Sequence, residues 1–223
     1  MRRLLVTALG MTMLSGCAAP HDEFRNRPLA ANPSAFIAAE IGFARLAQEK
    51  GQWTAFRETA HPDAVMFVPQ RVKARDWLKA QKDPAEAVKW QPHAVYVSCD
   101  GNSGVTTGAW QKGGGNGYFT TVWLRDPISG KINWVLDHGD GLTTPRAAPD
   151  FIESKQAKCG SRPAVPIEAG DEGDDMAVGL SGDQTLSWTS TVHPDQSRHL
   201  VIRLWDGKTM ATVIDDKVAA PPK

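Results

Sequence analysis

Apolar side chains recur three or four positions apart from residue 33 to residue 50, which is the spacing of one helix face. Glu40 interrupts this apolar stripe. Asn32 is a favoured N-cap residue, and Pro33 is favoured at the first helical position. Gly51 suits the C-terminal cap. The pattern therefore predicts one long helix over this range.

Two shorter helices and a strand are predicted next along the chain. Residues 52–60 place Trp53 and Phe56 on one side of a short helix, and residues 73–83 are typical of another. Between them, residues 63–69 form a compact apolar run that ends at a proline, which indicates a strand.

The pattern becomes extended beyond residue 88. Four runs are rich in β-branched and aromatic residues, as strands are, and they cover 88–100, 104–111, 117–126 and 131–139. Short glycine-rich turns separate them, which favours antiparallel neighbours. The order of elements predicts an α+β fold, with helices packed on one face of a curved antiparallel sheet.

The segments 38–69 and 99–141 resemble the NTF2-like superfamily, in particular its SnoaL-like, DUF4440-type branch. Family-like positions are occupied by Gly108, Trp110, Trp123, Trp134 and Asp137. The resemblance covers about half of the chain and implies an NTF2-like domain over 33–141, a cone whose open end is a ligand pocket. Some members are isomerases, dehydratases or cyclases, and many are binding or assembly modules. Many are homodimers, so a homodimer is expected here too.

The last third of the chain lies outside this resemblance. Residues 142–175 are rich in proline, glycine and charge, and predict an irregular linker. Residues 176–217 contain three further strand-like runs, which are too few to form an independent core readily. We expect a small antiparallel β extension that docks on the preceding domain.

The first residues are typical of a bacterial lipoprotein signal. Two arginines precede a short apolar stretch that is too short to span a bilayer, and "LSGC" ends at Cys17. In such signals residues 1–16 are removed and the cysteine is acylated, which leaves 17–32 as a tether. The alternative is an ordinary secretory peptide. Because Ala18 follows the cysteine, the signal predicts the outer membrane, with the protein facing the periplasm.

Two further cysteines are compatible with that compartment. In an oxidising periplasm, Cys99 and Cys159 are expected to form a disulfide, and two unpaired thiols are the alternative. Loss of the two signal arginines would change the formal charge from zero to −2, which gives no basic surface for nucleic acid.

His138 is the strongest candidate for chemistry, because imidazole titrates near neutral pH. Alternation along 131–139 places Trp134, Leu136 and His138 on one face and Asp137 on the other. Asp140 lies between glycines and can turn back towards His138. An ordinary structural role is the alternative for both residues.

A second candidate carboxylate lies in the loop 59–65. Asp63, with His61, could act across a pocket, or it could be an ordinary loop residue. The large aromatics could line the same pocket or form the core under the helices. The candidates for the pocket lining are Phe67, Trp110, Trp123, Trp134 and His138.

These features predict that the protein binds a small apolar or amphipathic molecule. The alternatives are an enzyme of the isomerase, dehydratase or cyclase type, with His138, Asp140 and Asp63 as the acid–base set, and an assembly lipoprotein whose cone is filled by its own aromatics. No metal site is predicted, because ligands at 137, 138 and 140 would splay apart on a strand and turn. No cofactor is predicted either, since no phosphate-binding glycine loop is present.

Overall fold

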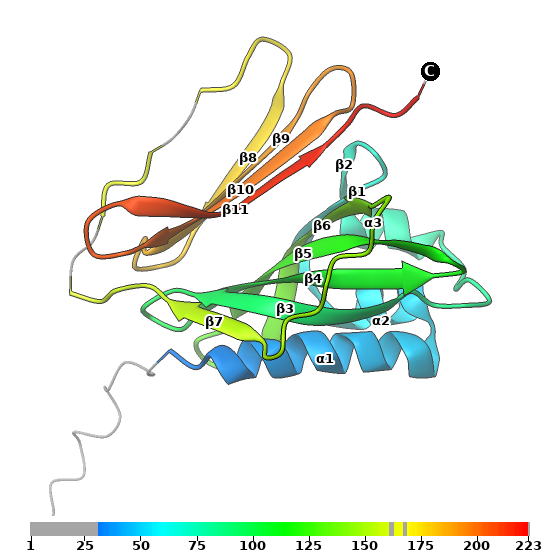
Figure 1. The fold of residues 1–223 in the computed structure, drawn as a ribbon, viewed down its shortest axis with the longest axis horizontal. Coiled ribbons are helices and arrows are strands. Elements are labelled where there is room, and N and C mark those ends of the chain that lie inside the picture. Colours follow the sequence, from blue (N-terminus) through cyan, green and yellow to red (C-terminus); the bar gives the residue numbers. More distant parts are fainter. Residues whose placement is uncertain (1–30, 161–162, 167–168, 223) are drawn as a thin grey trace, which may run out of the picture.

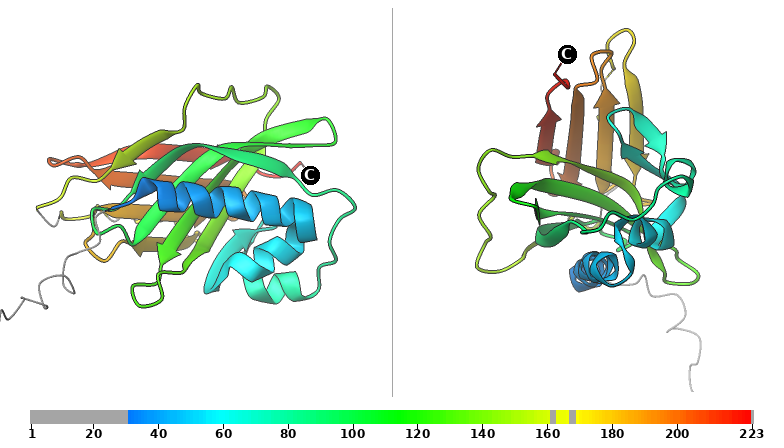
Figure 2. Two further views of the ribbon diagram at one scale, coloured as in Figure 1. Left: turned by 90° about the horizontal axis from the view of Figure 1, so that it is seen from below. Right: turned by 90° about the vertical axis from the view of Figure 1, so that its right-hand side faces the viewer.

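The computed structural model describes residues 31–160, 163–166 and 169–222. The described chain forms three layers, a helical layer, a curved main sheet and a second sheet near the C-terminus (Figure 1). Two further views show the helices on one face of the main sheet and the C-terminal sheet on the opposite face (Figure 2). The signal peptide at 1–16, the lipidation at Cys17 and almost all of the tether at 17–32 lie outside the described residues.

The helical layer contains α1 (Pro33–Lys50), α2 (Gln52–Thr59) and α3 (Ala74–Lys79). α1 begins after Asn32 with a proline in its first turn, and it ends at Gly51, whose φ of 105° favours glycine. One face of α1 is buried through Phe36, Phe43 and Ala47. The long helix predicted from its apolar stripe is therefore present with the predicted bounds.

The main sheet has seven strands in the order β2-β1-β6-β5-β4-β3-β7. Their bounds are β1 (Ala60–Phe67), β2 (Arg71–Lys73), β3 (Lys89–Val97), β4 (Ser103–Lys112), β5 (Gly115–Arg125), β6 (Ile132–Gly141) and β7 (Glu153–Gln156). β1 runs parallel to β6, and β7 runs parallel to β3. The α+β class is thus confirmed, but the main sheet is mixed and the prediction of an antiparallel sheet is wrong in this respect. The antiparallel meander consists of β3, β4, β5 and β6, and β1 and β7 add to its two edges in parallel because long connections separate them from the strands that they pair with.

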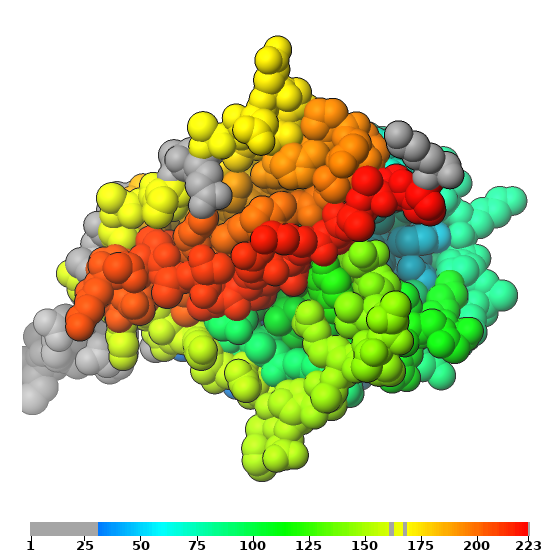
Figure 3. Space-filling view, turned by 45° about the horizontal axis from the view of Figure 1, so that its top comes forward, coloured from blue at the N-terminus to red at the C-terminus, as the bar shows by residue number. Residues whose placement is uncertain are grey.

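The C-terminal sheet has four antiparallel strands in the order β11-β10-β9-β8. They are β8 (Asp175–Leu180), β9 (Leu186–Val192), β10 (Arg198–Trp205) and β11 (Met210–Val218). In the space-filling view the strands β9 to β11, orange to red, lie across the green part of the main sheet (Figure 3). The second antiparallel sheet is confirmed, with four strands where the sequence indicated three. The segment 142–175, predicted as irregular, contains β7.

Each face of the main sheet has its own apolar core. The core under the helices contains Phe36, Phe43, Phe56, Trp123 and Trp134. The core under the C-terminal sheet joins Val105, Val122 and Leu136 of the main sheet to Leu200 and Ile202 of β10. The C-terminal sheet is therefore packed as a layer of the same molecule, and a homodimer would need some other surface.

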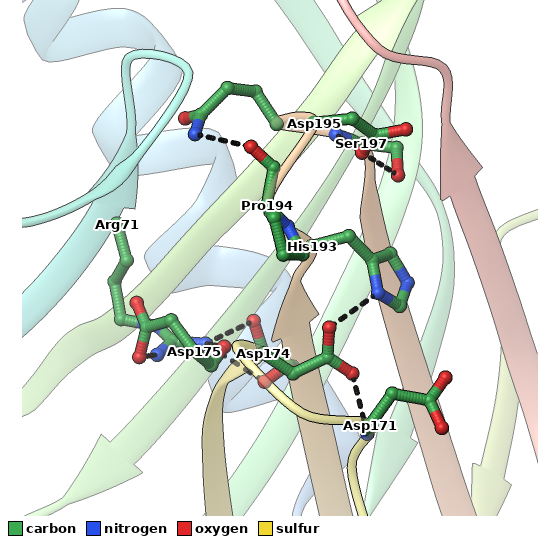
Figure 4. A network of polar contacts seen from close by, with 10 residues as sticks. Arg71, Asp171, Asp174, Asp175, His193, Pro194, Asp195 and Ser197 are labelled. Atoms are coloured by element: carbon green, nitrogen blue, oxygen red, sulfur yellow. Dashed lines mark hydrogen bonds and ion pairs between the residues drawn. The ribbon is translucent and has the colours of Figure 1, made fainter.

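A disulfide and polar contacts hold the chain around the two sheets. The predicted disulfide between Cys99 and Cys159 is present, with 5.4 Å between the two Cα atoms, and it ties the turn after β3 to the segment that leaves β7. Arg71, which begins β2, forms an ion pair with Asp175 and donates to the carbonyl oxygen of Ser190 at 2.8 Å (Figure 4). Near this contact, His193 Nδ1 lies 2.8 Å from a carboxylate oxygen of Asp174 (Figure 4). The contacts of Arg71 join β2 of the main sheet to β8 and β9 of the C-terminal sheet.

Among the described helices, none is long and apolar enough to cross a membrane.

Candidate ligand-binding cavity

A cavity of about 430 Å³ opens at the end of the main sheet where β6 finishes. Its volume is within the range of small-molecule sites, and such sites are mostly apolar with a few polar groups. Its apolar wall includes Phe43, Phe56, Met66, Trp90, Trp110 and Phe119. Its polar groups include Gln52, Thr121, Asp137, His138 and Asp140.

A β-bulge in β6 decides which polar groups face the helices. Val122 of β5 lies opposite Leu136, but the next residue, Trp123, lies opposite Trp134, which leaves Val135 as an extra residue in β6. The extra residue reverses the alternation at this point. Trp134 consequently packs under the helices, whereas Leu136 packs under the C-terminal sheet.

The reversal places Asp137 and His138 differently from the predicted faces. Asp137 lies on the helix side with Trp134, and His138 lies with Leu136 under the C-terminal sheet. The prediction that Trp134 shares a face with His138 is therefore wrong. A simple alternation of side chains fails wherever a bulge adds a residue.

Asp137 is the carboxyl that reaches the cavity from the helix side. It lies deep in the molecule, and its exposed part faces the cavity. The hydroxyl of Thr121 donates to Asp137 Oδ1 at 3.0 Å, and this is the one side-chain donor that the described residues give it. Asp137 therefore keeps acceptor capacity that is directed at the cavity.

Glu40 forms a second buried carboxyl behind the cavity wall. It is completely buried on α1, and Trp90 Nε1 donates to its Oε1 at 2.6 Å. The Thr106 hydroxyl donates to its Oε2, and that hydroxyl in turn accepts a hydrogen bond of 2.8 Å from Trp123 Nε1. A charged or neutral carboxyl can be kept in a core only with such partners.

Burial raises the pKa of both carboxyls. Burial raises the pKa of Glu40 to about 7, although hydrogen bonds from Thr106 and Trp90 oppose the rise. Burial also raises the pKa of Asp137 to about 7, and the charge of Glu40 adds to that rise. At neutral pH the pair can therefore hold or release a proton beside an apolar cavity.

His138 lies at the other side of the same cavity. Its ring stands edge-on to Phe67, with 5.3 Å between the ring centroids. Burial lowers the pKa of His138 to about 3, and the charges of Arg198 and His199 add to the effect. Neither ring nitrogen has a hydrogen-bond partner among the described residues. His138 is thus a neutral ring that holds unused donor and acceptor capacity.

The structure does not gather the predicted acid–base set. Asp140 borders the cavity mouth, where its Oδ1 accepts a hydrogen bond of 2.8 Å from the Gly141 amide. Asp63 lies on β1 with its side chain 89% exposed, and it is not part of the cavity wall. Its nearest ionic partner is His61, at 3.7 Å.

The predicted aromatic lining is divided between wall and core. Phe67 and Trp110 line the cavity. Trp123 and Trp134 do not, because both are buried under the helices with their indole nitrogens bonded to Thr106 and Thr59. The Glu40–Asp137 pair was not predicted from the sequence, although the charge of Glu40 inside the apolar stripe of α1 was a visible signal.

No group of three or more His, Cys, Asp or Glu side chains within the described ranges is placed to hold a metal ion.

Comparison with known proteins finds similarity among solved structures. An NTF-2 like protein of unknown function from Shewanella oneidensis is 14% identical, with a TM-score of 0.40 over 48% of this chain and 98% of that protein. A cystatin-like fold protein from Burkholderia xenovorans is 15% identical, with a TM-score of 0.40 over 50% and 92%. A DUF3225 family protein from Pectobacterium atrosepticum is 13% identical, with a TM-score of 0.38 over 49% and 90%.

The solved structures similar to this chain include NTF2-like and cystatin-like fold proteins. Each likeness covers about half of this chain and nearly all of the other protein. No family model matches the sequence, and no curated protein matches it.

Proposed function

We propose that the protein binds a small apolar or amphipathic molecule in the cavity at the open end of the main sheet. The observation that carries the proposal is the cavity itself, about 430 Å³ with an aromatic wall and a few polar groups on two sides. A cone closed by its own aromatics, as an assembly lipoprotein would have, is disfavoured by this open volume.

The lipobox-like sequence supports attachment of this binding protein to the cell envelope through a lipid on Cys17. The proposed location is the outer membrane, with the cavity in the periplasm. The Cys99–Cys159 disulfide is compatible with that oxidising compartment. Metabolic labelling with a radioactive fatty acid tests the attachment, since a Cys17→Ser variant would lose the label. A label retained by that variant would contradict it.

Native mass spectrometry of the protein purified from its own envelope tests ligand binding. We expect a retained small molecule in the wild type and its loss in Trp110→Ala, because Trp110 lines the cavity. Trp188→Ala is the matched control, since Trp188 packs on Gly179 of β8 and is absent from the cavity wall. Loss of the molecule in both variants, or in neither, would place it elsewhere.

A second candidate function, proton transfer to or from a bound substrate, is favoured by Asp137. A carboxyl with a pKa near 7 beside an apolar cavity is suited to act as a general base at neutral pH. In this proposal Asp137 accepts the proton and Glu40 limits how readily it stays ionised. The predicted trio of His138, Asp140 and Asp63 does not have this arrangement.

Exchange of α-hydrogens in a panel of cyclic ketones in D₂O, followed by NMR, tests the second function. Exchange above the buffer rate in the wild type and its loss in Asp137→Asn would support a general base. A wild type that never exceeds the buffer rate would count against proton transfer and leave ligand binding standing.

A further inference from the structure

The cavity continues from the helix side of the main sheet to the side under the C-terminal sheet. β1 pairs with β6 as far as Met66 opposite Asp137, whereas β6 continues to Gly141 with only β5 beside it. The cavity wall includes Gly139 and Gly141 from this unpaired edge. It also includes Tyr118 and His138, whose side chains lie on the face under the C-terminal sheet. We call this part of the cavity its far end.

Polar atoms without partners lie at this far end of the cavity and directly behind it. Within the described part of the chain, no hydrogen-bond partner is found for either ring nitrogen of His138 or for the Tyr118 hydroxyl, and both residues line the cavity. The Nε atoms of Arg71 and Arg198 also lack partners there, and these two guanidiniums pack against the cavity-lining Phe67 without being part of the wall themselves. His138 is 3% exposed and Tyr118 is 6% exposed. Buried polar groups in native proteins nearly always have a partner, so a cluster of such atoms beside a cavity indicates a polar ligand group.

The distances show that these atoms belong to one place. The Tyr118 and His138 rings are 6.4 Å apart between centroids. The Cζ atoms of Arg198 and Arg71 lie 5.6 Å and 5.9 Å from the centroid of Phe67, which itself stands edge-on to His138. Arg198 also donates to the Gly139 carbonyl oxygen at 3.2 Å, so its guanidinium is held at the unpaired edge of β6.

The free atoms are mainly donors. Each Nε–H of a guanidinium can only donate, a phenol hydroxyl donates readily, and a neutral imidazole supplies one donor and one acceptor. A group rich in acceptor oxygens matches this set, and carboxylate and related anions form the strongest such bonds with arginine.

The charges around the site distinguish the two arginines. Arg71 is already committed to Asp175 and Ser190. Arg198 donates to the carbonyl oxygen of Gly139, and burial lowers its pKa while the charge of the Asp140 carboxylate opposes that lowering. Asp140 therefore competes with an incoming anion for Arg198.

We propose that the far end of the cavity is a subsite for the anionic head group of an amphipathic ligand, and that Arg198 of the C-terminal sheet binds this group together with Tyr118 and His138. The proposal rests on the proposed ligand-binding function. It also gives the C-terminal extension a role, because β10 supplies the charged residue that completes the site.

Two fluorescent probes test the subsite, because they share an aromatic body and differ in charge. The probes are 1-anilinonaphthalene-8-sulfonate and N-phenyl-1-naphthylamine, which lacks the sulfonate. We expect Arg198→Met to weaken binding of the sulfonate probe about tenfold, as the loss of a charged hydrogen bond would. The neutral probe should change by no more than about twofold, since it makes no ionic contact.

Further variants keep the test decisive. Asp140→Asn should tighten the sulfonate probe, because a competing carboxylate is removed, and this prediction stands even where Arg198→Met fails to fold. Trp110→Ala should weaken both probes. Arg45→Met removes an exposed guanidinium whose recorded partner is Glu49 on the same helix, and it should change neither.

The outcomes separate the subsite from the cavity. Both probes weakened equally by Arg198→Met, or an unchanged sulfonate affinity in both Arg198→Met and Asp140→Asn, would overturn the subsite and leave ligand binding intact. If neither probe binds the wild type in a saturable way, the proposed function and the subsite are both overturned.

Discussion

Asp137 and His138 are neighbours in the sequence, yet they lie in two different environments on opposite faces of the main sheet. On the helix side, Asp137 and the buried Glu40 accept hydrogen bonds from Thr121, Trp90 and Thr106. On the other side, both nitrogens of His138 lack partners within the described residues. The polar groups on the helix side therefore have partners within the protein, whereas His138, under the C-terminal sheet, gains a partner when a polar ligand group enters the cavity.

Removing the central acceptor of the helix side should have the largest effect. We expect Glu40→Ala to lower the free energy of unfolding by about 4 kcal/mol. The substitution leaves the Trp90 indole N–H without an acceptor, and it also creates a cavity in the core. Urea unfolding measures the change. Glu49→Ala, on the exposed side of the same helix, should cost less than about 1 kcal/mol. Equal effects of Glu40→Ala and Glu49→Ala would show that the hydrogen bonds of Glu40 do not stabilise the fold.

The packing of the C-terminal sheet should contribute nearly as much. Leu200 is completely buried between the sheets, whereas Leu180 of β8 is 41% exposed. We expect Leu200→Ala to lower the free energy of unfolding by about 3 kcal/mol, because a buried leucine leaves a cavity. The matched Leu180→Ala should cost about 1 kcal/mol or less. A small effect of Leu200→Ala would mean that the two sheets are not one cooperative unit.

The pH dependence of stability tests the raised pKa of Asp137. Its pKa is raised to about 7 in the folded protein, so the folded state binds more protons than the unfolded chain does between the ordinary value and that pKa. Its contribution to stability is therefore complete at low pH and is lost as the pH rises through about 7. Relative to the wild type, Asp137→Asn should gain up to about 4 kcal/mol between about pH 4 and pH 8, because the pKa rise is about three units. Chemical unfolding at both pH values would show it, and parallel pH profiles would contradict it.

Replacing His138, on the face under the C-terminal sheet, should change the free energy of unfolding in the opposite direction to Glu40→Ala. His138→Phe removes two unpartnered nitrogens from a buried site, so we expect the ligand-free protein to gain about 1 kcal/mol of unfolding free energy. His199→Phe is the control, because His199 already bonds Asp215 at 2.7 Å and should not be stabilised in this way. Destabilisation by His138→Phe would show that the ring nitrogens are satisfied in the free protein.

The sequence predicts much of the helical layer and the meander, because their signals are local. The apolar stripe of α1, its proline start and its glycine end define the helix that the structure contains. Glu40 within that stripe was a local signal for a buried carboxyl. Its partner Asp137 was hidden, because the bulge at Val135 follows from pairing with β5 and not from the alternation within β6.

The remaining features depend on contacts between distant segments. β7 is exposed along its whole length and has no apolar pattern, so it is a strand only through its backbone pairing with β3. The charge of Arg198 acts on His138 and Tyr118 because the C-terminal sheet packs across the main sheet. No spacing in the sequence encodes that packing, and therefore the far end of the cavity could not be predicted.

The most direct test of the central claim is the ¹⁵N NMR spectrum of the histidine side chains, with the His138 signals assigned from His138→Phe. We expect His138 to stay neutral from about pH 5 to pH 8, because burial lowers its pKa to about 3. We also expect its ring-nitrogen signals to shift when 1-anilinonaphthalene-8-sulfonate is added, while those of the partly exposed His61 do not. The anionic subsite would be ruled out by a His138 that titrates near its ordinary pKa, or by His138 signals that do not change with saturating probe.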